Sequence, residues 1–124
     1  MLEKDLLNEY ELSLVEFSSE QWEGQGFIDL KTRTVYINQD LDEIERKKIL
    51  LHEIGHLNHY SSLYETAPLL CENQADCFMI EHLIAEEVAE YGIEAFNVTN
   101  FMKRHKMKTM REEALIEKEL RKIS

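Results

Sequence analysis

The sequence predicts an α+β fold in which a small three-stranded sheet comes first and a helical remainder follows. Three short stretches rich in β-branched and aromatic residues lie within the first 38 residues, and beyond them the apolar residues recur at helical spacing. The chain has 124 residues and no internal repeat or linker, so we expect residues 1–124 to form a single domain.

The expected strands follow a short helix over residues 2–10. They cover residues 12–17, 26–30 and 34–38, and the turn-like Lys31-Thr32-Arg33 separates the last two. We expect these strands to form an antiparallel sheet.

Capping signals mark the helices. Asp40, with Glu43 three residues later, is typical of a capping box that begins a helix running to about Tyr60. Pro68 in a first turn and Gly92 just past an end indicate a second long helix. The expected helices cover residues 40–60, 69–91, a short segment after Thr99, and 109 to near the C-terminus, where Thr109 and Glu112 form another capping pair.

The net charge of -11 is unevenly distributed. Residues 1–96 hold 21 acidic residues against 6 Lys/Arg, whereas residues 97–124, the basic helical C-terminal segment, hold 8 Lys/Arg against 4 acidic residues. An acidic surface repels a phosphate backbone, so only residues 102–111 are a candidate nucleic-acid contact. We expect the basic side chains of that stretch to pack against the acidic body instead. They are Lys103, Arg104, Lys106, Lys108 and Arg111.

Several features favour a cytoplasmic protein without a membrane anchor. No run approaches the roughly 18 apolar residues that a membrane-spanning helix needs. The N-terminus lacks the basic and apolar regions of a signal peptide. Cys71 and Cys77 would then be reduced, and their spacing of six differs from a C-x-x-C zinc site.

The motif His52-Glu53-Ile54-Gly55-His56 is an H-E-x-x-H inside a predicted helix. Its two histidines lie about 40° apart on one helix face, one turn from each other, so both imidazoles can reach one metal ion. The opposite face carries Leu50, Ile54 and Leu57. The motif therefore predicts a helix that buries its back and presents two zinc ligands to a cleft.

A catalytic zinc ion usually takes three protein ligands, so a third ligand is needed. His59 lies about 10 Å along the helix axis from His52, too far to share a tetrahedron with it. Glu72 is the better candidate. Asp76 lies on the same helix face, four residues later, so one carboxylate can bind the metal while the other accepts a hydrogen bond from a ligand histidine.

Together these segments resemble the ImmA/IrrE metallopeptidases. The resemblance covers about residues 12–107 and rests on the strand at Tyr36-Ile-Asn38, the H-E-[LI]-G-H motif, and an E-x-x-A-[ND]-x-F motif at residues 72–78. It implies a zincin-like domain with Glu72 as the third zinc ligand and Asp76 at the family's acidic position. It also implies a protein substrate, a repressor-type regulator encoded by a phage or mobile element.

The predicted function is therefore site-specific cleavage of a regulatory protein by a zinc metalloendopeptidase. Glu53, about 100° around the helix from His52, would be the general base. The strand at 34–38, if it forms the sheet edge, could bind an extended peptide by strand addition. Candidates for stabilising the oxyanion or contacting the substrate are Tyr36, His59, Tyr60, Tyr64 and His82.

Two alternatives belong to other functional classes. One is a non-proteolytic anti-repressor or interaction module that keeps zinc for structure. The other is a DNA-binding regulator that uses the basic residues after position 97.

Overall fold

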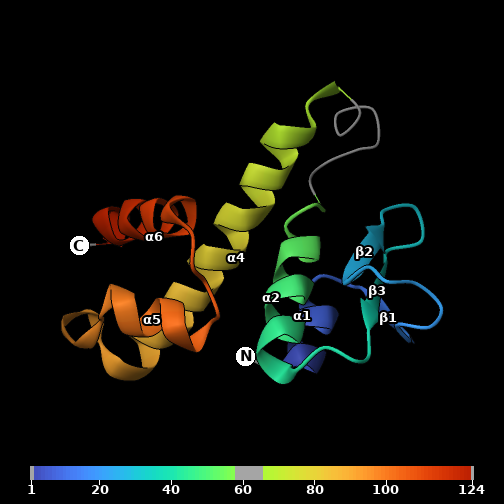
Figure 1. Cartoon of the computed structure of the whole chain (residues 1–124), viewed down its shortest axis with the longest axis horizontal. Helices are drawn as coiled ribbons and strands as arrows, with labels where there is room; N and C mark the ends of the chain where they lie inside the picture. Colours follow the sequence, from blue (N-terminus) through green and yellow to red (C-terminus); the bar gives the residue numbers. More distant parts are fainter. Residues whose placement is uncertain (1, 58–65, 124) are drawn as a thin grey trace.

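The structure is a computed structural model that describes residues 2–57 and 66–123, and it confirms the α+β class (Figure 1). The elements, in chain order, are α1 (Glu3–Glu9), β1 (Ser13–Phe17), β2 (Gly26–Asp29), β3 (Thr34–Asn38), α2 (Glu43–Ile54), α4 (Pro68–Tyr91), the 3₁₀ turn η1 (Ile93–Ala95), α5 (Val98–Arg104) and α6 (Met110–Ile123).

The sheet is mixed, so the predicted antiparallel arrangement is wrong for one pair of strands. Its order is β1-β3-β2, with β2 antiparallel to β3 but β1 parallel to β3. In β3, the side chains of Val35 and Ile37 have no exposed surface, and burial on this scale favours the central position, where both strand edges are hydrogen-bonded. The strand at 34–38 is therefore not the sheet edge that the sequence suggested.

Helix α2 lies between the sheet and α4 (Figure 1). Leu50, Leu51 and Ile54 of α2 are buried together with Val35 and Ile37 of β3. The core continues through α4 to the C-terminal helices. Its further members there are Ile80, Leu83, Ile84, Phe101 and Ile116. This packing fixes α2 between two layers and leaves its polar face to form a site.

Helix α2 is shorter than the capping signals suggested at both ends. Its N-cap is Asp42, whose Oδ1 accepts a hydrogen bond from the Glu45 N–H at 2.8 Å, whereas Asp40 accepts one from the Ser19 N–H in the preceding loop. At the other end the helix gives way to a turn at Gly55. The predicted end at Tyr60 lies outside the described residues.

The remaining helices follow their predicted signals closely. Helix α4 begins at Pro68 and ends just before Gly92. Helix α5 begins at Val98, two residues earlier than expected, because the side chain of Asn97 caps it. At the start of α6, Glu112 accepts a hydrogen bond from the Thr109 N–H and the Thr109 hydroxyl accepts one from the Glu112 N–H, so this predicted capping pair is confirmed.

The basic C-terminal segment packs against the acidic body through ion pairs, as expected. The Arg104 guanidinium contacts Glu87 of α4 at 2.5 Å. The Lys106 ammonium pairs with Asp42 at the start of α2. Arg111 also forms an ion pair, which belongs to the candidate site. Three of the five basic side chains in residues 102–111 therefore have carboxylate partners among the described residues.

Helices α2 and α4 approach each other closely at Gly55. A Cβ atom at this position would lie 2.8 Å from the Cα and 3.1 Å from the carbonyl oxygen of Ala75, which has no exposed surface. Both opposing atoms belong to the backbone, so a side chain at position 55 would force the helices apart. Glycine is required here by the contact between helices.

We predict that Gly55→Ala lowers the free energy of unfolding by about 1–3 kcal/mol, the usual cost of overpacking. Helix propensity alone predicts the opposite, a gain of up to about 1 kcal/mol. Urea denaturation in the presence of a chelator measures the difference. Glu90→Ala, on the exposed surface near the end of α4, is the control, and its free energy of unfolding should stay within about 0.5 kcal/mol of the wild-type value. A Gly55→Ala protein as stable as the wild type would contradict the close contact.

Candidate metal centre

The end of α2 places both histidines of the H-E-x-x-H motif on the side that faces α4. His52 lies in the last turns of the helix and His56 in the turn after it, where the His56 N–H donates to the Glu53 carbonyl oxygen at 3.0 Å. The two imidazole rings have centroids 5.0 Å apart and an interplanar angle of 84°. His56 is buried and His52 is half-buried.

Glu72 on α4 reaches between these two rings. Its Oε2 lies 2.9 Å from His52 Nε2, and its Oε1 lies 3.3 Å from His56 Nε2. His52, His56 and Glu72 each offer one ligand atom, and these atoms all lie within 4.8 Å of one another. Two imidazole nitrogens and one carboxylate oxygen form the donor set typical of a catalytic zinc site, which keeps a fourth position for water. The three residues therefore fit a zinc ion in both chemistry and spacing.

Asp76 follows Glu72 by one turn and contacts the other nitrogen of His52. Its Oδ1 lies 2.8 Å from His52 Nδ1. Burial is the largest single effect and opposes the charge on both groups, but their mutual hydrogen bond and the neighbouring charges together outweigh it, so the pKa of His52 is raised and that of Asp76 is lowered. If His52 Nδ1–H donates to Asp76, Nε2 is left with the lone pair that a metal requires.

The other carboxylate oxygen of Asp76 is held by Arg111 of α6. Arg111 Nη1 lies 2.7 Å from Asp76 Oδ2. The sequence indicated that the basic segment packs on the acidic body, but it did not show that one of these arginines reaches the candidate site. The excess of basic residues over 102–111 was the only signal, and it does not identify a partner.

Glu53 points from α2 toward the sheet. The backbone N–H of Ile28 in β2 faces its carboxylate and favours the ionised form. Burial raises the pKa of Glu53 to about 7, and the nearby Glu72 carboxylate adds to the shift, while His52 and the Ile28 N–H oppose it. A carboxyl group with a pKa near neutrality suits proton transfer at neutral pH.

A cleft of about 370 Å³ lies between β2, α2 and α4. It is bounded on the sheet side by Gly26 and on the helical side by Glu53 and Asp76. The complete lining is Gln25, Gly26, Glu45, Lys48, Ile49, His52, Glu53, Asp76 and Met79. The cleft therefore brings the edge strand β2 next to His52, one of the three candidate metal ligands.

The remaining predicted site residues divide into two groups. Tyr36 packs on Phe27, with ring centroids 4.5 Å apart, on the sheet face opposite the buried Val35 and Ile37. His82 packs on Phe78 of its own helix, with ring centroids 5.2 Å apart. These packing contacts do not bring Tyr36 or His82 to the candidate metal ligands. His59, Tyr60 and Tyr64 lie outside the described residues.

Comparison with known families gives a match over most of the chain. The model of the peptidase M78 family, described as the IrrE N-terminal-like domain, matches residues 7–113. The chain belongs to this family. The match confirms the resemblance to the ImmA/IrrE proteins and spans every element from β1 to α5. No curated protein and no solved structure matches the chain significantly.

Membership of the peptidase M78 family points to a metallopeptidase-type function with a protein as substrate. The family is typically metal-dependent, in keeping with the cluster of His52, His56 and Glu72. In residues 2–57 and 66–123 no helix is both long and apolar enough to cross a membrane. In the same part of the chain Cys71 and Cys77 are free cysteines.

The raised pKa of Glu53 predicts a pH-dependent difference between the metal-free wild type and Glu53→Gln. The folded pKa of about 7 exceeds the ordinary value of 4.5. The contribution of Glu53 to stability is therefore fully present below pH 4.5 and is lost as the pH rises through 7. A glutamine side chain cannot ionise. The free energy of unfolding of the variant, relative to that of the wild type, should therefore increase by roughly 2–3 kcal/mol when the pH is raised from 5 to 8.

Urea denaturation with a chelator at the two pH values measures this difference. Repeating it with saturating zinc is the control, because a cation beside the carboxylate favours its ionised form and should shrink the gap. A gap that did not change between pH 5 and pH 8 would contradict the burial of Glu53.

Proposed function

We propose that this chain is a zinc-dependent metalloendopeptidase that cleaves a regulatory protein, such as a phage or mobile-element repressor, at a specific site. The observation that carries the proposal is the convergence of His52, His56 and Glu72 within 4.8 Å, next to the half-buried carboxyl group of Glu53. A zinc ion with a purely structural role needs no general base beside it. The arrangement therefore favours hydrolysis over structural metal binding.

The residues divide the chemistry between them. A bound zinc ion would supply Lewis-acid polarisation of the scissile carbonyl and would lower the pKa of a coordinated water from 15.7 to about 7. Glu53 would accept a proton from that water as it attacks the carbonyl carbon, and would pass the proton to the nitrogen of the departing amine. Asp76 would keep His52 in the tautomer that offers Nε2.

Strand β2 is the edge that could bind an extended substrate. The Asn38 N–H donates to the Gln25 carbonyl oxygen at 2.9 Å, and hydrogen-bonded pairs alternate along an antiparallel ladder. Ile28, opposite Val35, is therefore at a non-hydrogen-bonded position, so its N–H points away from β3 and toward Glu53. A peptide added to this edge would lie along the cleft beside the candidate metal ligands, as in a zincin-like fold.

The ion pairs of the C-terminal segment support a proteolytic role over DNA binding. Arg104, Lys106 and Arg111 already contact carboxylates of this chain. A phosphate backbone would have to compete with these carboxylates and with the acidic surface around them.

We predict that His52→Ala and His56→Ala abolish both zinc binding and peptide cleavage, whereas Glu53→Gln abolishes cleavage and retains zinc. A glutamine keeps the shape of Glu53 but cannot accept the proton of the water. Zinc content is measured by metal analysis of the purified chain, and cleavage by mass spectrometry of a proteome-derived peptide library. A wild type that binds zinc but cleaves no better than Glu53→Gln would favour the interaction-module alternative.

We predict that Ile28→Pro lowers kcat/KM for peptides by roughly 3- to 10-fold or more, with zinc content unchanged, because it removes an N–H at the β2 edge that could bind a substrate strand and that also faces Glu53. Proline is tolerated in an edge strand where the N–H takes no part in the ladder. Leu14→Pro is the matched control, because Leu14 is also half-buried on an edge strand and its N–H faces the open side of β1. Equal losses in both variants would argue against β2 as the substrate edge.

A further inference from the structure

Arg111, in the first turn of α6, contacts two side chains of α4. Its Nη1 lies 2.7 Å from Asp76 Oδ2, and its Nη2 donates to Asn73 Oδ1. The Asp76 side chain is 22% exposed and that of Arg111 is 49% exposed, so the pair lies at the edge of the site, not deep within it. The guanidinium thus connects the C-terminal helix to the helix that carries Glu72.

These contacts continue without interruption to the candidate metal ligands. Asp76 uses Oδ2 for Arg111 and Oδ1 for His52 Nδ1, at 2.8 Å, so its carboxylate is held on both sides. His52 Nε2 then lies 2.9 Å from Glu72 Oε2 in the ligand cluster. We propose that Arg111 is a positioning residue of the metal centre: by fixing the Asp76 carboxylate, it orients the imidazole of His52 toward the metal. The inference rests on the proposed zinc site.

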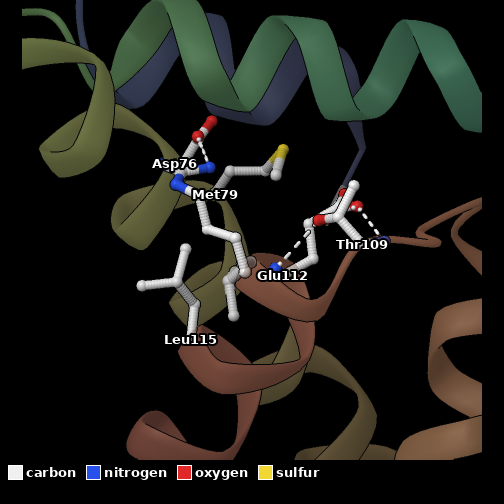
Figure 2. Close-up of a pocket in the computed structure, with 7 residues that line it drawn as sticks. Asp76, Met79, Thr109, Glu112 and Leu115 are labelled. Atoms are coloured by element: carbon white, nitrogen blue, oxygen red, sulfur yellow. Dashed lines mark hydrogen bonds and ion pairs between the residues drawn. The ribbon is translucent and has the colours of Figure 1, made fainter. Parts of the chain in front are cut away.

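The structure holds Arg111 in place through the start of α6. The capping pair of Thr109 and Glu112 fixes the first turn, with hydrogen bonds of 3.0 Å in both directions. Figure 2 shows Asp76 and Met79 on one side of a pocket and Thr109, Glu112 and Leu115 on the other. Arg111 also lines this pocket and its side chain is 49% exposed, so its contacts with Asp76 and Asn73 orient the guanidinium. The packing of α6 against α4 therefore contributes to the orientation of the candidate metal ligands.

Coulomb's law and positioning predict opposite effects of removing this arginine. A cation near a divalent ion repels it, so charge alone predicts tighter zinc binding when Arg111 is neutralised. Loss of positioning predicts weaker binding, because Asp76 would be free to rotate and His52 would be less well oriented. The direction of the change in zinc affinity therefore separates the two explanations.

The experiment compares zinc affinity, measured by competition with a chromogenic chelator, for the wild type and Arg111→Gln. Removal of a group that contacts a ligand histidine typically costs 10- to 100-fold, so we expect roughly a 3- to 10-fold loss for Arg111, which acts one contact further away. Arg104→Gln is the matched control, because it removes the same charge and an α4 ion pair, with Glu87, outside the site. Arg111→Lys, which keeps the charge but loses the two-pronged geometry, should fall between the wild type and Arg111→Gln.

A double-mutant cycle with Asp76→Ala tests the route. Asp76→Ala alone should weaken zinc binding by about 10- to 100-fold, and adding Arg111→Gln should cause no further loss. In thermal unfolding with a chelator, Arg111→Gln and Arg104→Gln should have similar midpoint temperatures. If Arg111→Gln does not fold, the zinc affinity of Arg111→Lys tests the inference instead. Zinc affinity in the Arg111 variants equal to or higher than in Arg104→Gln would overturn the inference alone. A wild type that binds no zinc would overturn the proposed metal centre with it.

Discussion

The close contact between α2 and α4 is the constraint on which the candidate site depends. Ala75 lies against Gly55, and Glu72, three residues before Ala75, shares its face of α4, while Asp76 follows Glu72 by one turn. The short side chain of an acidic residue spans only a few ångströms beyond its helix. Glu72 can therefore reach both imidazoles, and Asp76 can reach His52, only because glycine and alanine allow the two backbones to meet.

That contact also brings several carboxylates together where they are only partly exposed to solvent. Neighbouring cationic or hydrogen-bonding side chains stabilise most of these carboxylates. Asp76 lies between His52 and Arg111, and hydrogen bonds to both lower its pKa despite burial. Glu53 has no cationic partner of comparable strength among the described residues, and its pKa rises to about 7. Glu72 contacts both histidines. A divalent cation among these groups would compensate the negative charge, and this electrostatic argument agrees with the geometry of the ligand atoms.

The order of the strands determines how the site meets its surroundings. Because β3 is central, β2 becomes an edge strand next to α2, and the N–H of Ile28 faces the carboxylate of Glu53. An antiparallel sheet in sequence order would instead place β2 at the centre, with both of its edges paired. The parallel pairing of β1 with β3 thus leaves one edge of β2, the strand nearest the Glu53 carboxyl group, without a partner strand among the described residues, while Arg111 of the C-terminal segment contacts Asp76 on α4.

The sequence by itself determined the class of the fold, the positions of most elements and the candidate metal ligands. These properties follow from local physics: side-chain periodicity, capping residues such as Thr109 and Pro68, and the one-turn spacing of His52 and His56. Strand order and the contacts of Arg111 were decided by the tertiary structure. Both depend on contacts between residues far apart in the chain. A short apolar stretch has the same local pattern whether it becomes a central strand or an edge strand, and an arginine has the same sequence neighbours whether it contacts Asp76 or solvent.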